Sequence, residues 1–120
     1  MRRLLFFILV FAVLLWIANT TALKYDLYFI TSWFDAISHT IGGVVVSGAI
    51  VYFLQSWRFP KEILVLVFVL FIGLIWEVFE LNMGLTDTGA PWYFLDSVSD
   101  LLFDLLGAHI AYSFAKKNHV

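Results

Sequence analysis

The residues of this chain that could do chemistry are one histidine and six carboxylates that lie inside or at the ends of strongly apolar segments. They are Asp35, His39, Glu77, Glu80, Asp96, Asp100 and Asp104. Burying an ionisable group in an apolar medium costs several kcal/mol unless the group is paired or bound to a metal. These seven side chains are therefore the candidate functional site.

The spacing of these residues predicts which way they point. Asp35 and His39 are four residues apart, and Glu77 and Glu80 are three apart, whereas Asp96, Asp100 and Asp104 form a ladder at intervals of four. Each set falls on one face of a helix. Lipid offers no polar partners, so we expect the three faces to meet in a common interior.

Carboxylates held this close together would repel one another, and several would be protonated unless a cation were bound. A divalent metal ion is the simplest solution. The set has many oxygens and one nitrogen, which suits Mg²⁺, Mn²⁺, Ca²⁺ or Fe²⁺ and is compatible with Zn²⁺. Similar carboxylate pairs hold metals in soluble four-helix bundles. If the site is catalytic, His39 and Asp100 are the candidate catalytic residues.

The elements that must position these groups are membrane helices. Hydrophobic residues make up 62% of the chain and charged residues 13%, and the mean hydropathy is +0.94. These values lie outside the range of soluble domains. A chain of 120 residues has room for about four spanning helices of ~20 residues and for no separate soluble domain. The absence of cysteine excludes disulfides and thiolate metal sites.

Four apolar runs predict a single all-α domain, a polytopic bundle of four transmembrane helices at about residues 4–18, 30–57, 63–81 and 94–114. The first helix lacks a polar stripe and should be peripheral. Six cations flank one side of these runs, and only Lys24 lies on the other; the six are Arg2, Arg3, Arg58, Lys61, Lys116 and Lys117. The positive-inside rule then predicts a multi-pass protein of the cell membrane with both termini in the cytoplasm. Residues 1–22 also fit a cleaved signal peptide, which would leave the later helices in the same orientation.

Depth along the helices places the polar groups at one level. At 1.5 Å of rise per residue, Glu77 lies roughly 24 Å from Lys61, and Asp100 lies roughly 24 Å from Lys116. His39 lies roughly 29 Å from Arg58, and Asp104 is deeper than the others. In a hydrocarbon core about 30 Å thick, this level is near the outer surface, so we expect the site to open toward the outer face.

Three motifs resemble those of small membrane protein families. The segment from Asp35 to His39 with Gly42-Gly43 is similar to the Asp-x-x-x-His helix of VanZ-like and YjdF-like proteins. Glu77-x-x-Glu80 resembles the Glu-x-x-Glu helix of YjdF-like proteins, and Asp96-x-x-x-Asp100 with Gly107-Ala108 resembles their last helix. VanZ-like proteins more often carry amides at the positions of Glu80 and Asp104, so the YjdF-like pattern fits better. The resemblance covers about the last 85 residues and implies a fold more than a function.

Simpler structural interpretations remain open for several of these groups. Asp35 could be a polar group at the start of its helix, and Asp96 could be a helix N-cap. Glu77 and Glu80 could share protons with the aspartates. His109 fits a packed or lipid-facing position better than a ligand position.

Three function classes are consistent with the sequence. The first is a metal-dependent enzyme that acts on a lipid or lipid-linked head group at the outer leaflet. The second is an ion or proton pathway, and the third is a structural or accessory membrane protein whose polar cluster fastens helices together. Membrane lipids are the expected partners, a homo-oligomer is compatible with the sequence, and no nucleic-acid-binding motif is present.

Overall fold

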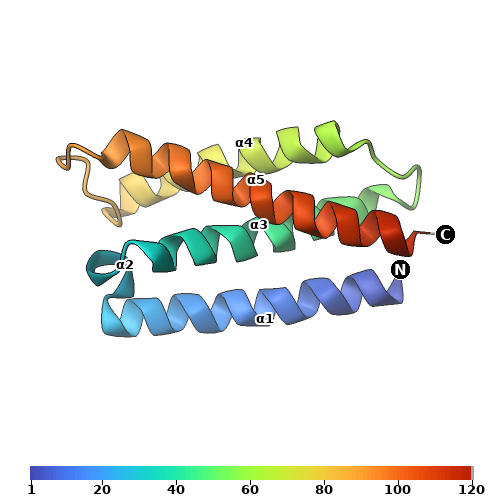
Figure 1. The fold of residues 1–120 in the computed structure, drawn as a ribbon, viewed down its shortest axis with the longest axis horizontal. Helices are drawn as coiled ribbons and strands as arrows, with labels where there is room; N and C mark the ends of the chain where they lie inside the picture. The colour runs from blue at the N-terminus through green and yellow to red at the C-terminus, as the bar shows by residue number, and fades with distance from the viewer. Residues whose placement is uncertain (120) are drawn as a thin grey trace.

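The computed structural model describes residues 1–119, and the described chain is helical with short connections (Figure 1). The helices are α1 (Arg2–Tyr25), α2 (Leu27–Ile30), α3 (Trp33–Leu54), α4 (Glu62–Met83) and α5 (Tyr93–Asn118). The long helices alternate in direction, so both termini and the α3–α4 connection lie at one end, which we call the terminal end. The short helix α2 and the α4–α5 connection lie at the other, which we call the α2 end. The predicted all-α class is confirmed.

The bounds of two helices differ from those that the apolar runs predict. The first helix continues to Tyr25 instead of ending near residue 18, and the second long helix covers Trp33–Leu54 instead of 30–57. Between them lies α2, which the apolar pattern did not predict. Asp26 has a left-handed backbone (φ 53°), a conformation that aspartate tolerates better than most residues. This local reversal ends α1 and lets the chain turn into α2.

Among residues 1–119, three helices are long and apolar enough to cross a membrane: α1, α3 and α4. The fourth long helix, α5, has 26 residues, about 39 Å at 1.5 Å per residue, but its acidic side chains make it less apolar than the other three. Length and composition therefore support three of the four predicted spans.

The closest packing in the described chain joins α3 and α5 through two glycines. A Cβ atom added to Gly43 would lie 2.0 Å from the backbone oxygen of Asp104, and one added to Gly107 would lie 2.0 Å from the backbone oxygen of Thr40. Only glycine permits such an approach, which is a common way for helices to associate in membranes. The backbones of α3 and α5 are therefore in direct contact at two places, at Gly43 and at Gly107.

The remaining long helices flank this pair. Ile8 of α1 packs on Gly48 of α3, while α4 packs mainly on α5, so α1 and α4 lie on different sides of the molecule (Figure 1). The apolar core lies toward the terminal end and contains Leu4, Ile8, Val51, Val65, Val69, Ala108, Tyr112 and Ala115. The buried polar side chains lie mostly toward the α2 end: Ser38, His39, Ser47, Glu77, Asp100 and Asp104. The interior of the bundle is thus apolar toward the terminal end and mostly polar toward the α2 end.

The glycine contacts predict a clear difference between neighbouring alanine substitutions. Gly43→Ala should destabilise the protein by about 1–3 kcal/mol or more, because the added methyl meets backbone that cannot move away. Gly42→Ala is the matched control, since a Cβ there has nothing within 4 Å. Thermal unfolding of both variants in detergent checks this, and equal transition midpoints would contradict the packing.

Candidate functional site

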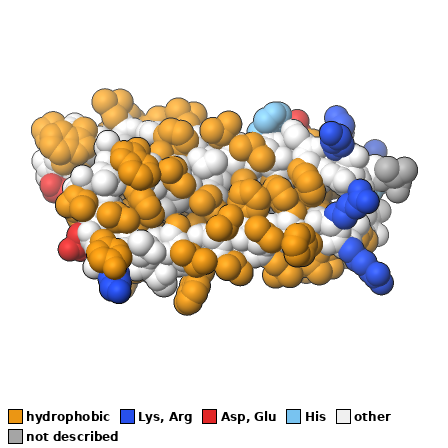
Figure 2. All heavy atoms as spheres, turned by 60° about the horizontal axis from the view of Figure 1, so that its bottom comes forward, with side chains coloured by type: hydrophobic (Ala, Val, Ile, Leu, Met, Phe, Trp, Pro, Cys, Tyr) orange, Lys and Arg blue, Asp and Glu red, His pale blue; other side chains and the backbone are white. Residues whose placement is uncertain are grey.

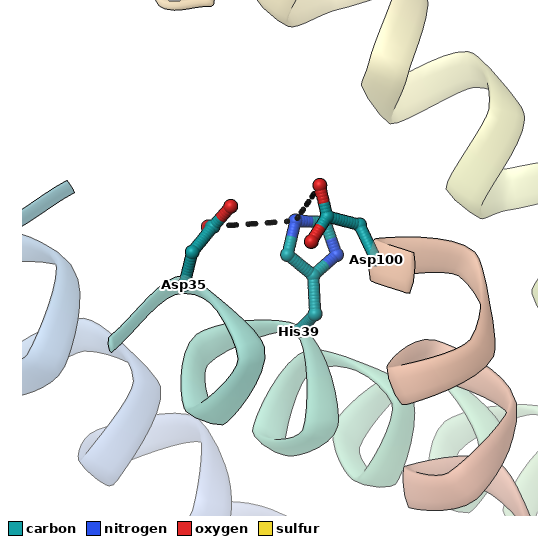
Figure 3. A group of neighbouring side chains, drawn as sticks. All are labelled: Asp35, His39 and Asp100. Carbon is teal, nitrogen blue, oxygen red and sulfur yellow. Dashed lines mark ion pairs between the residues drawn. The ribbon is translucent and has the colours of Figure 1, made fainter. Parts of the chain in front are cut away.

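His39 lies at the centre of the polar half, and both of its ring nitrogens face carboxylates. Its Nδ1 lies 3.1 Å from Oδ1 of Asp104 on α5. Its Nε2 lies 3.6 Å from Oδ1 of Asp35 on the same helix and 3.9 Å from Oδ2 of Asp100 on α5 (Figure 3). The His39 side chain is only 6% exposed. Three carboxylates therefore surround one buried imidazole.

The two sides of the ring have different geometry. The distance to Asp104 is that of a normal hydrogen bond, whereas the distances to Asp35 and Asp100 are too long for one. Two atoms bound to one metal ion at bond lengths of about 2.1 Å lie roughly 3.0–3.4 Å apart, depending on coordination geometry. The distances from Nε2 to the oxygens of Asp35 and Asp100 are therefore only slightly longer than those between two ligand atoms of one metal ion.

Helix α4 adds two glutamates to the same place. Ligand atoms of His39, Glu77 and Glu80 lie within 4.8 Å of one another, as do those of Asp35, His39 and Asp100. The Oε1 atom of Glu77 is buried and has no hydrogen-bond partner among the described residues. Glu80 accepts a hydrogen bond of 2.8 Å from Nε1 of Trp76, which orients its carboxylate. Two groups that could hold a metal ion thus share His39.

The structure brings six of the seven predicted residues to the site: five belong to the two possible ligand groups, and Asp104 contacts His39 from the other side. Asp104 binds the opposite nitrogen of His39 and belongs to neither group. Asp96 is exposed and also lies outside both groups. It is not an N-cap, because α5 begins at Tyr93 and places Asp96 in the first turn, where a negative charge favours the helix dipole.

The core of the site lies at one level of the bundle. His39 is six residues after the start of α3, and Glu77 is six residues before the end of α4. Asp100 is seven residues after the start of α5. At 1.5 Å per residue, all three lie about 9–11 Å inside the α2 end of their helices. The common level that the sequence predicts is present in the structure.

Sequence reasoning missed three side chains that support the site. Tyr28 of α2 is hydrogen-bonded to Asn19 of α1 and, at 3.3 Å, to Ser38, the neighbour of His39. Burial raises the pKa of the Tyr28 phenol, while the hydrogen bond with Ser38 lowers it. Trp76 donates a hydrogen bond to Glu80 from one turn earlier on α4. The sequence does contain a signal for the contact between Tyr28 and Asn19, because a lone amide in an apolar helix needs a hydrogen-bond partner.

The other histidine in a helix lies outside the site. His109 is exposed, and its Nδ1 lies 2.6 Å from Oε1 of Glu62. Deeper in the bundle, Ser47 donates to the backbone oxygen of Ala108 at 3.0 Å and so does not reach the carboxylates. The polar cluster therefore ends at Asp104.

Comparison with known protein families identifies the family of this chain. The model of the family described as "Predicted membrane protein (DUF2238)" matches residues 1–119. No curated protein and no solved structure matches the chain.

The contact with Asp104 predicts the tautomer of His39. An ionised carboxylate can only accept, so Nδ1 carries a proton in this contact. In Asp104→Asn the amide can donate instead, which would move the proton to Nε2. Long-range ¹⁵N–¹H NMR of the protein in micelles distinguishes the two tautomers. Asp96→Asn on the same helix is the control, and identical His39 spectra in all three proteins would contradict the assignment.

Proposed function

We propose that this chain, which belongs to the DUF2238 family of membrane proteins, holds a divalent metal ion near one membrane surface. The ligands are Asp35, His39, Glu77, Glu80 and Asp100, which come from α3, α4 and α5. The observation that carries the proposal is the buried, unpartnered Oε1 of Glu77. Leaving such an atom without a partner costs about 1–3 kcal/mol, and a bound cation removes that cost.

The contacts around the ligands fit this role. In this proposal Asp104 accepts the proton of Nδ1, and Nε2, which lies 3.6 Å from Asp35 and 3.9 Å from Asp100, binds the ion. Such a carboxylate–histidine arrangement is usual behind metal ligands. Trp76 fixes Glu80 in the same way. Four carboxylates and one imidazole favour Mg²⁺, Mn²⁺, Ca²⁺ or Fe²⁺, and Zn²⁺ is compatible.

The level of the site along the helices supports a catalytic function at the membrane surface. An ion about 10 Å inside the helix ends is close to the head groups of one leaflet. Such an ion would polarise a phosphoryl or carbonyl oxygen or activate water. We therefore propose an enzyme that acts on a lipid or lipid-linked head group, in which His39 and Asp100 are the residues nearest the reacting atoms.

The alternative functions have less support. A purely structural cluster is expected to pair its buried atoms, yet Glu77 Oε1 has no partner among residues 1–119. An ion or proton pathway needs polar groups through the terminal half. In that half the described core is apolar, and His109 is exposed and paired with Glu62.

For the membrane arrangement, we propose four crossings in the cell membrane with both termini in the cytoplasm. Helix α5 places Asp100 and Asp104 against α3, where they are shielded from lipid. Six of the seven Lys and Arg residues belong to the terminal end, and Figure 2 shows this concentration of positive charge. The order and spacing of the three acidic motifs support a relation to YjdF-like proteins.

Removing single ligands should abolish metal retention. Glu77→Gln and Asp100→Asn should each lower the metal content of the detergent-purified protein at least about tenfold, because second-shell changes alone cost 10–100-fold in affinity. Asp96→Asn should retain the metal. Inductively coupled plasma mass spectrometry after exposure to Mg²⁺, Mn²⁺, Ca²⁺, Fe²⁺ and Zn²⁺ measures this. If the native protein keeps none of the five ions, the metal proposal fails, and proton flux in liposomes then tests the pathway.

The absence of native cysteine allows the topology to be tested with single cysteines. Asp87→Cys lies in the α4–α5 connection and Asn118→Cys at the end of α5. A membrane-impermeant maleimide should label the first in intact cells and the second only after permeabilisation. Labelling of both from the same side would show that α5 does not cross.

A further inference from the structure

A groove of about 570 Å³ lies between the end of α3 and the first turns of α4, at the terminal end. Its lining is mainly apolar and includes Leu54, Trp57, Phe59, Ile63, Leu64 and Val67. Arg58 and Lys61 are the two charged residues that line it. The volume is within the range of ligand sites in proteins, and the groove combines an apolar lining with two cations.

The turn that carries the cations is attached to α5. The hydroxyl of Tyr112 donates to the backbone oxygen of Pro60 at 3.1 Å, and this bond is buried. The ring of Phe59 packs against the ring of Tyr112, with 5.7 Å between centroids. These two contacts hold residues 58–61 in place, so the mouth of the groove is already formed.

The positive charges at the mouth are not neutralised within the protein. No ion pair among residues 1–119 includes Arg58 or Lys61. The nearest acidic residue in the sequence is Glu62, and it pairs with His109 on α5 at 2.6 Å. The two cations are therefore available to an anion from outside the chain.

We propose that this groove binds one anionic phospholipid, with the phosphate at Arg58 and Lys61 and an acyl chain along Leu54, Ile63 and Leu64. Basic pockets between transmembrane helices are suited to anionic head groups. Trp57, which lines the groove, is 91% exposed, as expected for a residue at the membrane interface. A zwitterionic lipid lacks the net charge that the two cations would neutralise.

This lipid site is separate from the proposed metal site. His39 and Leu54 lie 15 residues apart on α3, about 22 Å along the helix. None of the residues that line the groove is a ligand in the acidic cluster. Loss of metal binding would therefore leave the lipid site unaffected.

Native mass spectrometry of the full chain in detergent tests the proposal with dioleoyl-phosphatidylglycerol and dioleoyl-phosphatidylcholine as probes. The native protein should retain the anionic lipid preferentially. The double variant Arg58→Gln/Lys61→Gln should lose about thirtyfold in affinity for it, since each cation near an anionic surface contributes roughly a factor of five. Lys116→Gln/Lys117→Gln removes the same charge from the same end outside the groove and should retain the preference.

A second variant tests the apolar part of the groove. Leu64→Trp keeps both cations but fills the groove, so it should lose the anionic lipid as well. Circular dichroism checks that each variant remains helical. Equal retention of both lipids by the native protein would overturn the proposal, as would equal losses in the two double variants. Equal binding of glycerol 3-phosphate, or a dimer that occupies the groove in place of lipid, would also overturn it.

Discussion

The structure depends on the direct contact between the backbones of α3 and α5. Gly43 lies on the backbone of Asp104, and Gly107 lies on the backbone of Thr40. Because His39 comes one turn before Gly43, the same contact brings its imidazole to the carboxylate of Asp104. A side chain at either glycine would move the helices apart and break this hydrogen bond. Close packing and the polar cluster are thus two results of one helix crossing.

The division of the interior into an apolar half and a polar half follows from the cost of burying polar atoms in lipid. Most buried polar groups have partners: Asp104 binds His39, and Ser47 binds the backbone oxygen of Ala108. Glu77 Oε1 is the exception among the described residues, and it lies where the other carboxylates converge. A buried unpartnered atom in a native protein calls for an explanation, and a ligand explains both the atom and its position.

Helix α4 contributes to both proposed sites, although it packs less closely on the bundle than α3 and α5 pack on each other. Near its C-terminal end, Glu77 and Glu80 complete the acidic cluster, while near its first turn Ile63 and Leu64 line the lipid groove. Most of its remaining surface is exposed and apolar. Its polar residues are therefore concentrated near its two ends, and the lipid-facing surface between them is free of charge.

The sequence by itself determined the helical class, the polar faces and their common level, because these follow from local spacing and from the rise of a helix. It did not reveal α2 or the full length of α1, since the reversal at Asp26 and the Tyr28–Asn19 contact depend on how two helices meet. Only the tertiary structure decided that Asp104 binds Nδ1 of His39, that Asp35 and Asp100 face Nε2, and that Asp96 faces outward. The rotation and offset of α5 against α3 set these roles, and they arise from glycine contacts between residues more than 60 positions apart.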